Sequence, residues 1–203
     1  MTIRQKITTL IILLTVVFAS ISFGFFITRF IIHVSGESMM PTLHNNDYVY
    51  GEPHPKLANI KKGDIIVFKD KNHWDFNNIY GDKNLSKKER KEFLIKRVIA
   101  IPGDKVTFDN NGIISVNGVR VKDDGKFYRG CPKISGDNYS KNKSFIVPAK
   151  HVFVRGDNIN NSKDSRFIYC YKPELRYLIY YDNIILKVKN VIKTGKILER
   201  FIN

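Results

Sequence analysis

The chain has 203 residues, of which 34 are Lys or Arg and 19 are Asp or Glu, so its formal net charge is +15. Hydrophobic residues make up 43% and aromatic residues 12% of the chain, which is enough to build a core and excludes a chain that is disordered throughout. Two cysteines exclude a disulfide-dense small scaffold and a cysteine-rich zinc module. The positive charge favours nucleic acid or an anionic membrane surface as a partner.

An apolar segment near the N-terminus predicts a membrane anchor. Between Lys6 and Arg29 lie 22 residues without a charge, which as a helix of about 1.5 Å per residue would cross the roughly 30 Å hydrocarbon core of a bilayer. The alternative, a cleaved secretory signal, would have an apolar region of only about 7–15 residues. We therefore interpret residues 1–29 as a cytoplasmic tip followed by an uncleaved transmembrane anchor.

The charges on either side of this segment predict its orientation. Arg4 and Lys6 precede it and only Arg29 follows it, so the positive-inside rule places the N-terminus in the cytoplasm and the rest of the chain outside it. The expected location is the plasma or inner membrane, crossed once. Nucleic acid is rarely a partner outside the cytoplasm, so membrane lipid is the partner that the charge predicts.

The rest of the chain reads as mostly β-structure. Apolar or alternating runs of strand length occupy residues 48–51, 64–68, 93–101, 105–108, 113–121, 145–147, 151–154 and 183–192. Gly, Pro, Asn and Asp separate them, and Asn117-Gly118 between two valines predicts a two-residue hairpin turn. No stretch outside the anchor has a clear 3.6-residue periodicity, so few helices are expected there.

The usual metal and nucleotide motifs are absent from the sequence. Its five histidines are scattered without an H-E-x-x-H pattern, and it has no C-x-x-C, P-loop or G-x-G-x-x-G. No metal and no cofactor are therefore expected. What stands out is a Ser/Gly/Pro segment, SGESMMPTL at 35–43, and a polar segment, GDNINNSKDSR at 156–166. Each alone is also compatible with an ordinary turn.

A third segment carries two adjacent cations inside an apolar strand, Lys96 and Arg97 in FLIKRVIAI. Because side chains alternate along a strand, one of the two is expected to face the core. Burial disfavours the charged form of a lysine, and a lysine with a lowered pKa can act as a general base. Ile95, Val98, Ile99 and Ile101 are the apolar neighbours expected around it. The alternative is an edge strand with both side chains reaching water.

Together these segments resemble the type I signal peptidase family of membrane-anchored Ser/Lys proteases. The resemblance covers the anchor and residues 35–43, 63–68, 95–106 and 156–166. It implies an all-β catalytic domain over residues 30–203, with a small inserted subdomain over roughly 107–149. The implied function is a signal peptidase I that removes signal peptides from exported preproteins at the outer face of the membrane.

The resemblance also implies roles for individual residues. Ser38 would be the nucleophile, Lys96 the general base and Ser162 the hydroxyl that orients Lys96. Asp164 and Arg166 would form a supporting salt bridge. The backbone N–H of Ser38 would donate to the oxyanion of the tetrahedral intermediate.

Two features of the sequence leave questions open. Some family members supply a second oxyanion donor from a serine two positions before the nucleophile, where this chain has Gly36, so the second donor is unknown. Cys131 and Cys170 either form a disulfide or remain two free thiols.

Two other functions compete with this interpretation. A specialised relative, such as a conjugation-pilin maturation peptidase or an organelle inner-membrane peptidase, would have the same chemistry and a narrower range of substrates. A non-catalytic membrane-anchored binding protein would keep the fold alone, but the presence of both Ser38 and Lys96 argues against it. The sequon Asn160-Asn161-Ser162 disfavours a compartment in which proteins are glycosylated.

Overall fold

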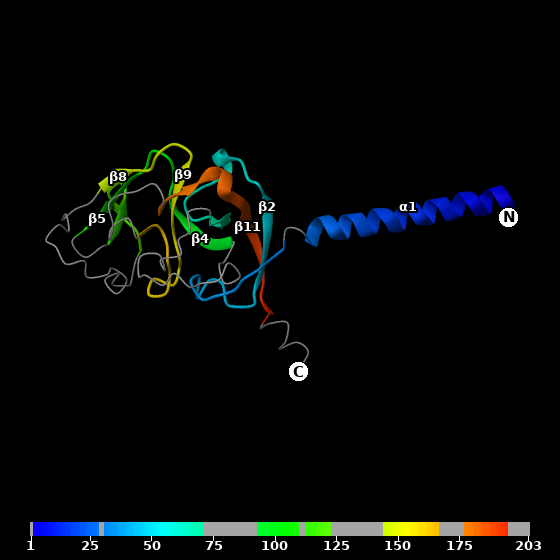
Figure 1. Cartoon of the computed structure of the whole chain (residues 1–203), viewed down its shortest axis with the longest axis horizontal. Helices are drawn as coiled ribbons and strands as arrows, with labels where there is room; N and C mark the ends of the chain where they lie inside the picture. Colours follow the sequence, from blue (N-terminus) through cyan, green and yellow to red (C-terminus); the bar gives the residue numbers. More distant parts are fainter. Residues whose placement is uncertain are drawn as a thin grey trace, which may run out of the picture. The chain divides into compact units, whose positions relative to one another are not determined.

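A computed structural model of the chain describes residues 2–28, 31–70, 93–109, 113–122, 144–166 and 177–194. Cys131 and Cys170 lie outside these ranges. The helix and strands of the described residues, which Figure 1 colours in chain order, are α1 (Ile3–Thr28), β1 (Ile32–His33), β2 (Tyr48–Pro53), β3 (Ile65–Lys69), β4 (Phe93–Ala100), β5 (Lys105–Phe108), β6 (Ile114–Val116), β7 (Val119–Arg120), β8 (Ser144–Ile146), β9 (His151–Arg155), β10 (Ile179–Tyr180) and β11 (Ile184–Ile192). Short 3₁₀ turns cover Leu57–Asn59 and Tyr181–Asn183.

The N-terminal helix α1 belongs to a separate compact unit, Met1–Ile32. Its stretch Ile3–Ser22 is long and apolar enough to cross a membrane. Three of its hydroxyl groups are satisfied within the helix, since Thr8, Thr9 and Ser20 donate to carbonyl oxygens four residues earlier at 2.8–2.9 Å. Such back-bonding leaves these hydroxyls without a need for water, which suits a helix surrounded by lipid.

The second unit, His33–Asn203, is built on a seven-stranded sheet with the strand order β1-β2-β11-β3-β4-β9-β10. Every pair from β2 to β10 is antiparallel. The N-terminal apolar helix followed by mostly antiparallel β-structure confirms the predicted fold class.

Strands β4 and β9 are covered by apolar side chains on both faces. Val98 and Val154, which are paired in the β4–β9 register, belong to one buried cluster, together with residues of β3 and β11. Ile99 and Phe153 point the other way, into a second cluster shared with β5 and β6. Burial on both faces explains why these two strands read as mostly apolar in the sequence, without a regular alternation with polar residues.

A second, four-stranded sheet has the order β7-β6-β5-β8. Strands β6 and β7 form the hairpin predicted at Asn117-Gly118, and these two residues have φ angles of 51° and 81°. Two consecutive positive φ values are typical of a type I′ turn, the turn for which Asn-Gly is preferred.

A buried carboxylate, Asp104, joins the two sheets where β4 leads into β5. It accepts hydrogen bonds from Ile101 N at 3.0 Å, Asn117 Nδ2 at 2.6 Å and Lys62 Nζ at 3.3 Å. Burial alone raises the pKa of this carboxyl, but these donors and the charge of Lys62 outweigh burial and lower it. Asp104 is therefore held ionised as the anchor of this junction.

Candidate active site

Ser38 lies in a loop between β1 and β2 that we call the serine loop (residues 34–47). Its two ends are joined, because Val34 N donates to Asp47 O at 2.8 Å and Asn46 N donates to Val34 O at 2.9 Å. Between them, Met39 and Leu43 are buried and anchor the loop in the core. Ser38 itself is half-buried, so its hydroxyl is presented by a fixed loop.

Lys96 comes from the middle of β4, and its side chain is only 3% exposed. Alternation along the strand places it on the same face as Leu94 and Val98, and Ile66 of β3 lies directly opposite it in the register. This apolar setting disfavours a charged amine.

The apolar residues around Lys96 differ in part from those expected. Val98 and Ile101 do belong to the cluster on its side of the sheet. Ile99 packs into the other cluster together with Ala100, and simple alternation is interrupted there by a register irregularity between Val98 and Ala100. The expected contribution of Ile99 was therefore wrong, and Ile66 and Leu94 replace it.

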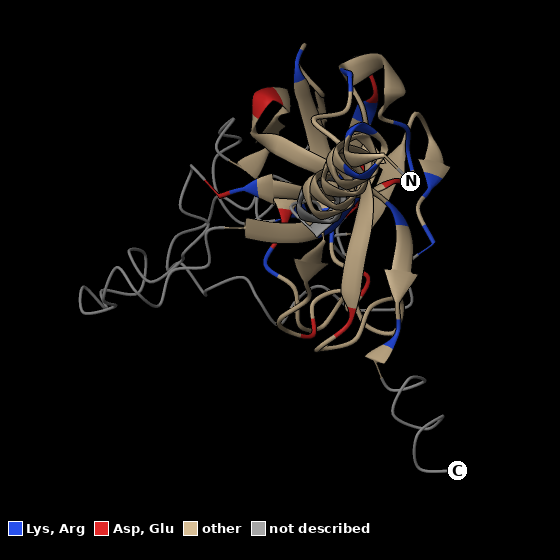
Figure 2. Cartoon of the chain, turned by 90° about the vertical axis from the view of Figure 1, so that its right-hand side faces the viewer, with Lys and Arg blue, Asp and Glu red and all other residues tan. Residues whose placement is uncertain are grey.

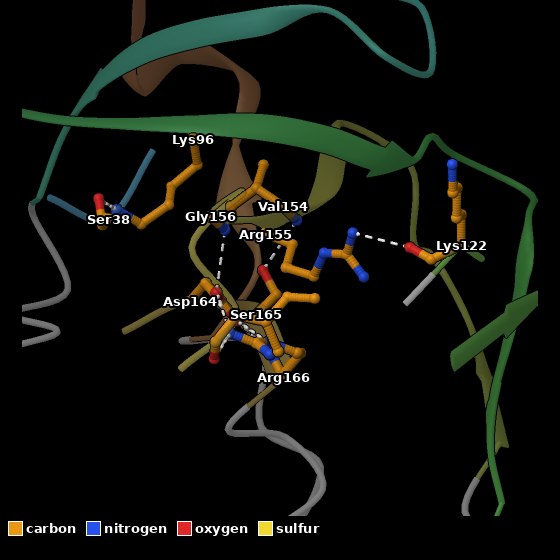
Figure 3. Close-up of polar contacts among 10 residues, drawn as sticks. Ser38, Lys96, Lys122, Val154, Arg155, Gly156, Asp164, Ser165 and Arg166 are labelled. Carbon is orange, nitrogen blue, oxygen red and sulfur yellow. Dashed lines mark hydrogen bonds and ion pairs between the residues drawn. The ribbon is translucent and has the colours of Figure 1, made fainter. Parts of the chain in front are cut away.

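The structure brings Ser38 and Lys96 together across 58 positions of sequence. Lys96 Nζ donates to Ser38 Oγ at 2.7 Å (Figure 3). It also donates to Ile95 O at 3.0 Å. With a neutral amine the first contact can reverse, so that the hydroxyl donates to the nitrogen. That reversed hydrogen bond is the geometry from which a base takes the proton of a serine nucleophile.

The polar segment 156–166 packs against the serine loop. Asn158 N donates to Ser38 O and Asn158 Nδ2 donates to Glu37 O, both at 3.0 Å. Asn161 Nδ2 donates to Glu37 Oε2 at 3.2 Å. These three hydrogen bonds fix the segment beside the residue that carries the hydroxyl.

Ser162 is brought next to Ser38 with Gly156 between them. A Cβ placed on Gly156 would lie 2.2 Å from Ser162 Oγ and 2.4 Å from Ser38 O, so only glycine fits there. The Ser162 hydroxyl is buried and makes no hydrogen bond to Lys96 within the described residues; it lies near Asp164 and helps to lower the pKa of that carboxyl. Its orienting role therefore stays a prediction.

Asp164 and Arg166 form the expected ion pair, with both side chains fully buried. Arg166 Nε donates to Asp164 Oδ1 at 2.7 Å and Nη2 to Oδ2 at 2.8 Å, and Gly156 N donates to Oδ2 at 3.0 Å (Figure 3). Burial raises the pKa of Asp164, but the charge and hydrogen bonds of Arg166 outweigh burial and lower it. The pair ties the far end of the segment to Gly156.

A second ion pair, Arg97 with Asp157, was not predicted from the sequence. Arg97 Nε and Nη2 donate to Asp157 at 2.8 and 2.6 Å, and Nη1 donates to Gly63 O at 2.7 Å. Burial raises the pKa of Asp157, and the hydrogen bond from Arg97 is the first of several contacts that together lower it. The sequence did contain a signal for this pair, because Lys96 and Arg97 are adjacent in one strand. Side chains alternate along a strand, so burial of Lys96 on one face points Arg97 toward the other face.

The backbone around Ser38 bears on the oxyanion. The N–H of Ser38 donates no hydrogen bond within the part of the chain that the structure describes, so it is available to an oxyanion. Gly36 has a φ of 110° and its N–H donates to Asn45 Oδ1 at 3.1 Å. A positive φ favours glycine over serine at this position, and the second oxyanion donor stays unassigned.

Metal ligands do not gather in the described part of the chain, where no three His, Cys, Asp or Glu side chains lie close enough together to hold an ion. Charged groups are spread over the domain instead, and Figure 2 shows Lys and Arg on several strands and loops with Asp and Glu between them.

Comparisons with known proteins identify the family of the chain. The family model described as "Signal peptidase, peptidase S26" matches residues 4–190. The chain is 30% identical over 159 residues to signal peptidase I of Bacillus amyloliquefaciens, covering 76% of this chain and 74% of the relative. It is 30% identical over 168 residues to signal peptidase I U of Bacillus subtilis, covering 80% and 79%.

Two more distant likenesses complete the comparison. The human mitochondrial inner membrane protease subunit 1 is 29% identical over 144 residues, covering 70% of this chain and 60% of the relative. A crystal structure of a signal peptidase I from Enterococcus faecalis is 21% identical and covers 64% of this chain and 97% of that one, with a TM-score of 0.37. This structural likeness is too low to add to the argument.

Proposed function

The chain belongs to the signal peptidase family, peptidase S26, and we propose that Ser38 and Lys96 are the nucleophile and general base of its serine endopeptidase activity. It is a signal peptidase I by its similarity to the bacterial enzymes over most of its length, and its substrates are preproteins that carry signal peptides. The observation that supports the assignment best is the 2.7 Å contact between Lys96 Nζ and Ser38 Oγ on an apolar face of β4.

The proposed reaction has two acyl-transfer steps. Neutral Lys96 takes the hydroxyl proton as Ser38 Oγ attacks the scissile carbonyl carbon, and the oxyanion that forms accepts a hydrogen bond from Ser38 N–H. The proton then passes from Lys96 to the leaving amine as the peptide bond breaks and an ester to Ser38 remains. Lys96 next takes a proton from water, whose oxygen attacks the ester carbonyl carbon, and returns that proton to Ser38 Oγ as the ester bond breaks and the signal peptide leaves as a carboxylic acid.

The 156–166 segment supports this dyad. Ser162 is proposed to orient the Lys96 amine, and its closeness to Ser38 through Gly156 is compatible with that role. Asp164 and Arg166 hold the segment from its buried end. The lowered pKa of Asp164 keeps its carboxylate ionised and paired with Arg166 at neutral pH.

The proposed domain division and topology follow the sequence. Residues 1–29 are the anchor and 30–203 the peptidase domain, with 107–149 as an inserted subdomain that takes in most of the second sheet. Arg4 and Lys6 keep the N-terminus in the cytoplasm, and the basic domain meets anionic lipid on the outer face. Protease added to sealed spheroplasts should then degrade the domain, and its full protection would contradict the orientation.

A second candidate is a peptidase of the same chemistry that processes few substrates. The 29% identity to the human mitochondrial protease subunit is the observation that favours it. Incubation with several unrelated preproteins separates the two, because a general signal peptidase processes most of them and a specialised one processes few.

Cleavage of a preprotein by purified enzyme in detergent tests the proposed function. The Ser38→Ala variant should remain folded and lose cleavage, because the nucleophile is gone while the loop retains its backbone contacts. Substantial processing by Ser38→Ala would refute the assignment of the nucleophile.

A further inference from the structure

The chain just after β11 is tied to the serine loop by an ion pair and two hydrogen bonds. Lys193 Nζ lies 2.9 Å from Asp47 Oδ2 and donates to Thr42 O at 2.6 Å. The next residue, Thr194, donates from Oγ1 to Asn46 O at 2.5 Å. The Asp47 side chain is 3% exposed and that of Lys193 is 33% exposed, so the pair lies at the edge of the core.

We call these contacts of Lys193 and Thr194 with Thr42, Asn46 and Asp47 the clasp. Asp47 connects the clasp to the end of the serine loop at which the loop closes. Its Oδ2 also accepts a hydrogen bond from His44 N at 2.8 Å, and its main-chain oxygen closes the loop by accepting from Val34 N. Burial raises the pKa of Asp47, but the His44 N–H and the hydrogen bond and charge of Lys193 outweigh burial and lower it. Lys193 thus faces a carboxylate that stays ionised.

Thr42 connects the clasp to the reacting residues. Its hydroxyl oxygen accepts from Arg97 Nη2 at 3.4 Å, so Thr42 is held by Lys193 through its carbonyl and by the neighbour of Lys96 through its side chain. Toward Ser38 the chain makes two tight turns, with Leu43 N donating to Met39 O at 2.9 Å and Met40 N to Glu37 O at 3.1 Å. A shift at Thr42 is therefore transmitted to Ser38 by a stiff segment.

We propose that Lys193 is a positioning residue for catalysis, which sets the place of Ser38 relative to Lys96 by clasping Asp47 and Thr42. The inference rests on the proposed function. Lys193 lies beyond residue 190, where the match to the family model ends. The ammonium group both neutralises a buried carboxylate and donates to a carbonyl, so a neutral side chain of similar length cannot replace it.

The test compares kcat and KM of the full-length enzyme in detergent for a peptide that contains a signal-peptide cleavage site. Lys193→Met should lower kcat about tenfold and leave KM within about twofold, because Ser38 is displaced from Lys96 while the substrate is still bound. Lys193→Arg should keep most of the activity, since a guanidinium can donate to both oxygens. Lys189→Met is the matched control, because Lys189 lies on β11, is 49% exposed and only approaches Glu52 at 3.9 Å.

Asp47→Asn provides an independent variant should Lys193→Met fail to fold. It should also lower kcat, and the double variant should lose no more than either single one, since both remove the same clasp. A kcat within about twofold of wild type in Lys193→Met, or an equal loss in Lys189→Met, overturns the inference. Wild type and Ser38→Ala in the same assay separate the two hypotheses: a wild type that does not cleave refutes the proposed function and this inference together.

Discussion

Replacing Gly156 with alanine tests how closely the serine loop packs against the 156–166 segment. The added methyl group would lie 2.4 Å from Ser38 O and 2.2 Å from Ser162 Oγ. The Ser162 hydroxyl can rotate away, whereas the Ser162 Cβ, at 2.5 Å, and the main-chain oxygen of Ser38 cannot. To restore ordinary contact at 3.4 Å, the serine loop and the 156–166 segment must separate by about 1 Å.

A displacement of this size is large for catalysis. A misplacement of about 1 Å can lower a reaction rate by about 10²-fold, so kcat/KM of Gly156→Ala should fall by about two orders of magnitude. Overpacking should also lower the free energy of unfolding by about 1–3 kcal/mol. The measurements are preprotein cleavage in detergent and thermal unfolding of the same preparation.

Gly103→Ala is the control for a general loss of stability. Gly103 has a φ of +88° and nothing within 4 Å of an added Cβ, so alanine there meets only backbone strain of about 1–2 kcal/mol. This variant should be less stable and keep its kcat/KM. A Gly156→Ala enzyme that retains kcat/KM within about threefold of wild type would show that the site tolerates the shift and would refute the reasoning.

Three further predictions follow from the site. Lys96→Arg should be as inactive as Lys96→Ala, because a guanidinium stays protonated, and wild-type kcat/KM should rise with pH as the neutral amine grows; an active arginine variant or a flat profile would contradict the base role. Ser162→Ala should slow turnover less than Lys96→Ala does, because an unoriented amine is a poorer base. Normal turnover with a lower melting temperature would instead make Ser162 structural, through its contact with Asp164. The pKa of Asp157 is lowered in the folded protein, so its contribution to stability is present above the unfolded value of about 3.9 and is lost as the pH falls through the folded value. The free energy of unfolding should therefore fall less steeply with acid in Arg97→Met than in wild type. An identical pH dependence in the two proteins would contradict this.

The sheet could be predicted from the sequence wherever a strand was long enough to show a pattern. The runs at 93–101 and 151–154 correspond to β4 and β9, and the Asn117-Gly118 turn lies where expected. Strands β1 and β10 have two residues each and were missed, because two residues contain no periodicity.

The sequence predicted which residues form the site better than it predicted which residues contact them. The odd placement of Lys96 inside an apolar strand was visible in the sequence, and the resemblance to a known family supplied Ser38. The face on which Lys96 lies and its neighbour Ile66 depend on the β3–β4 register, which sequence patterns do not define. The pair of Arg97 with Asp157 joins residues 60 positions apart, and a loop carries one of them, so only the fold could reveal it.

The side-chain amide of Asn117 has a consequence for how the purified protein ages. Asn-Gly sequences are prone to deamidation, in which the backbone nitrogen of the glycine attacks the amide carbon and ammonia leaves. Here the amide is held on both sides, with Nδ2 donating to Asp104 and Oδ1 accepting from Lys105 N at 2.8 Å. The folded protein should therefore resist this reaction, while a chain that deamidates in the unfolded state must refold with a new carboxylate facing Asp104. Storage damage should consequently follow the time that the protein spends unfolded, which mass spectrometry of samples kept below and near the melting temperature can measure.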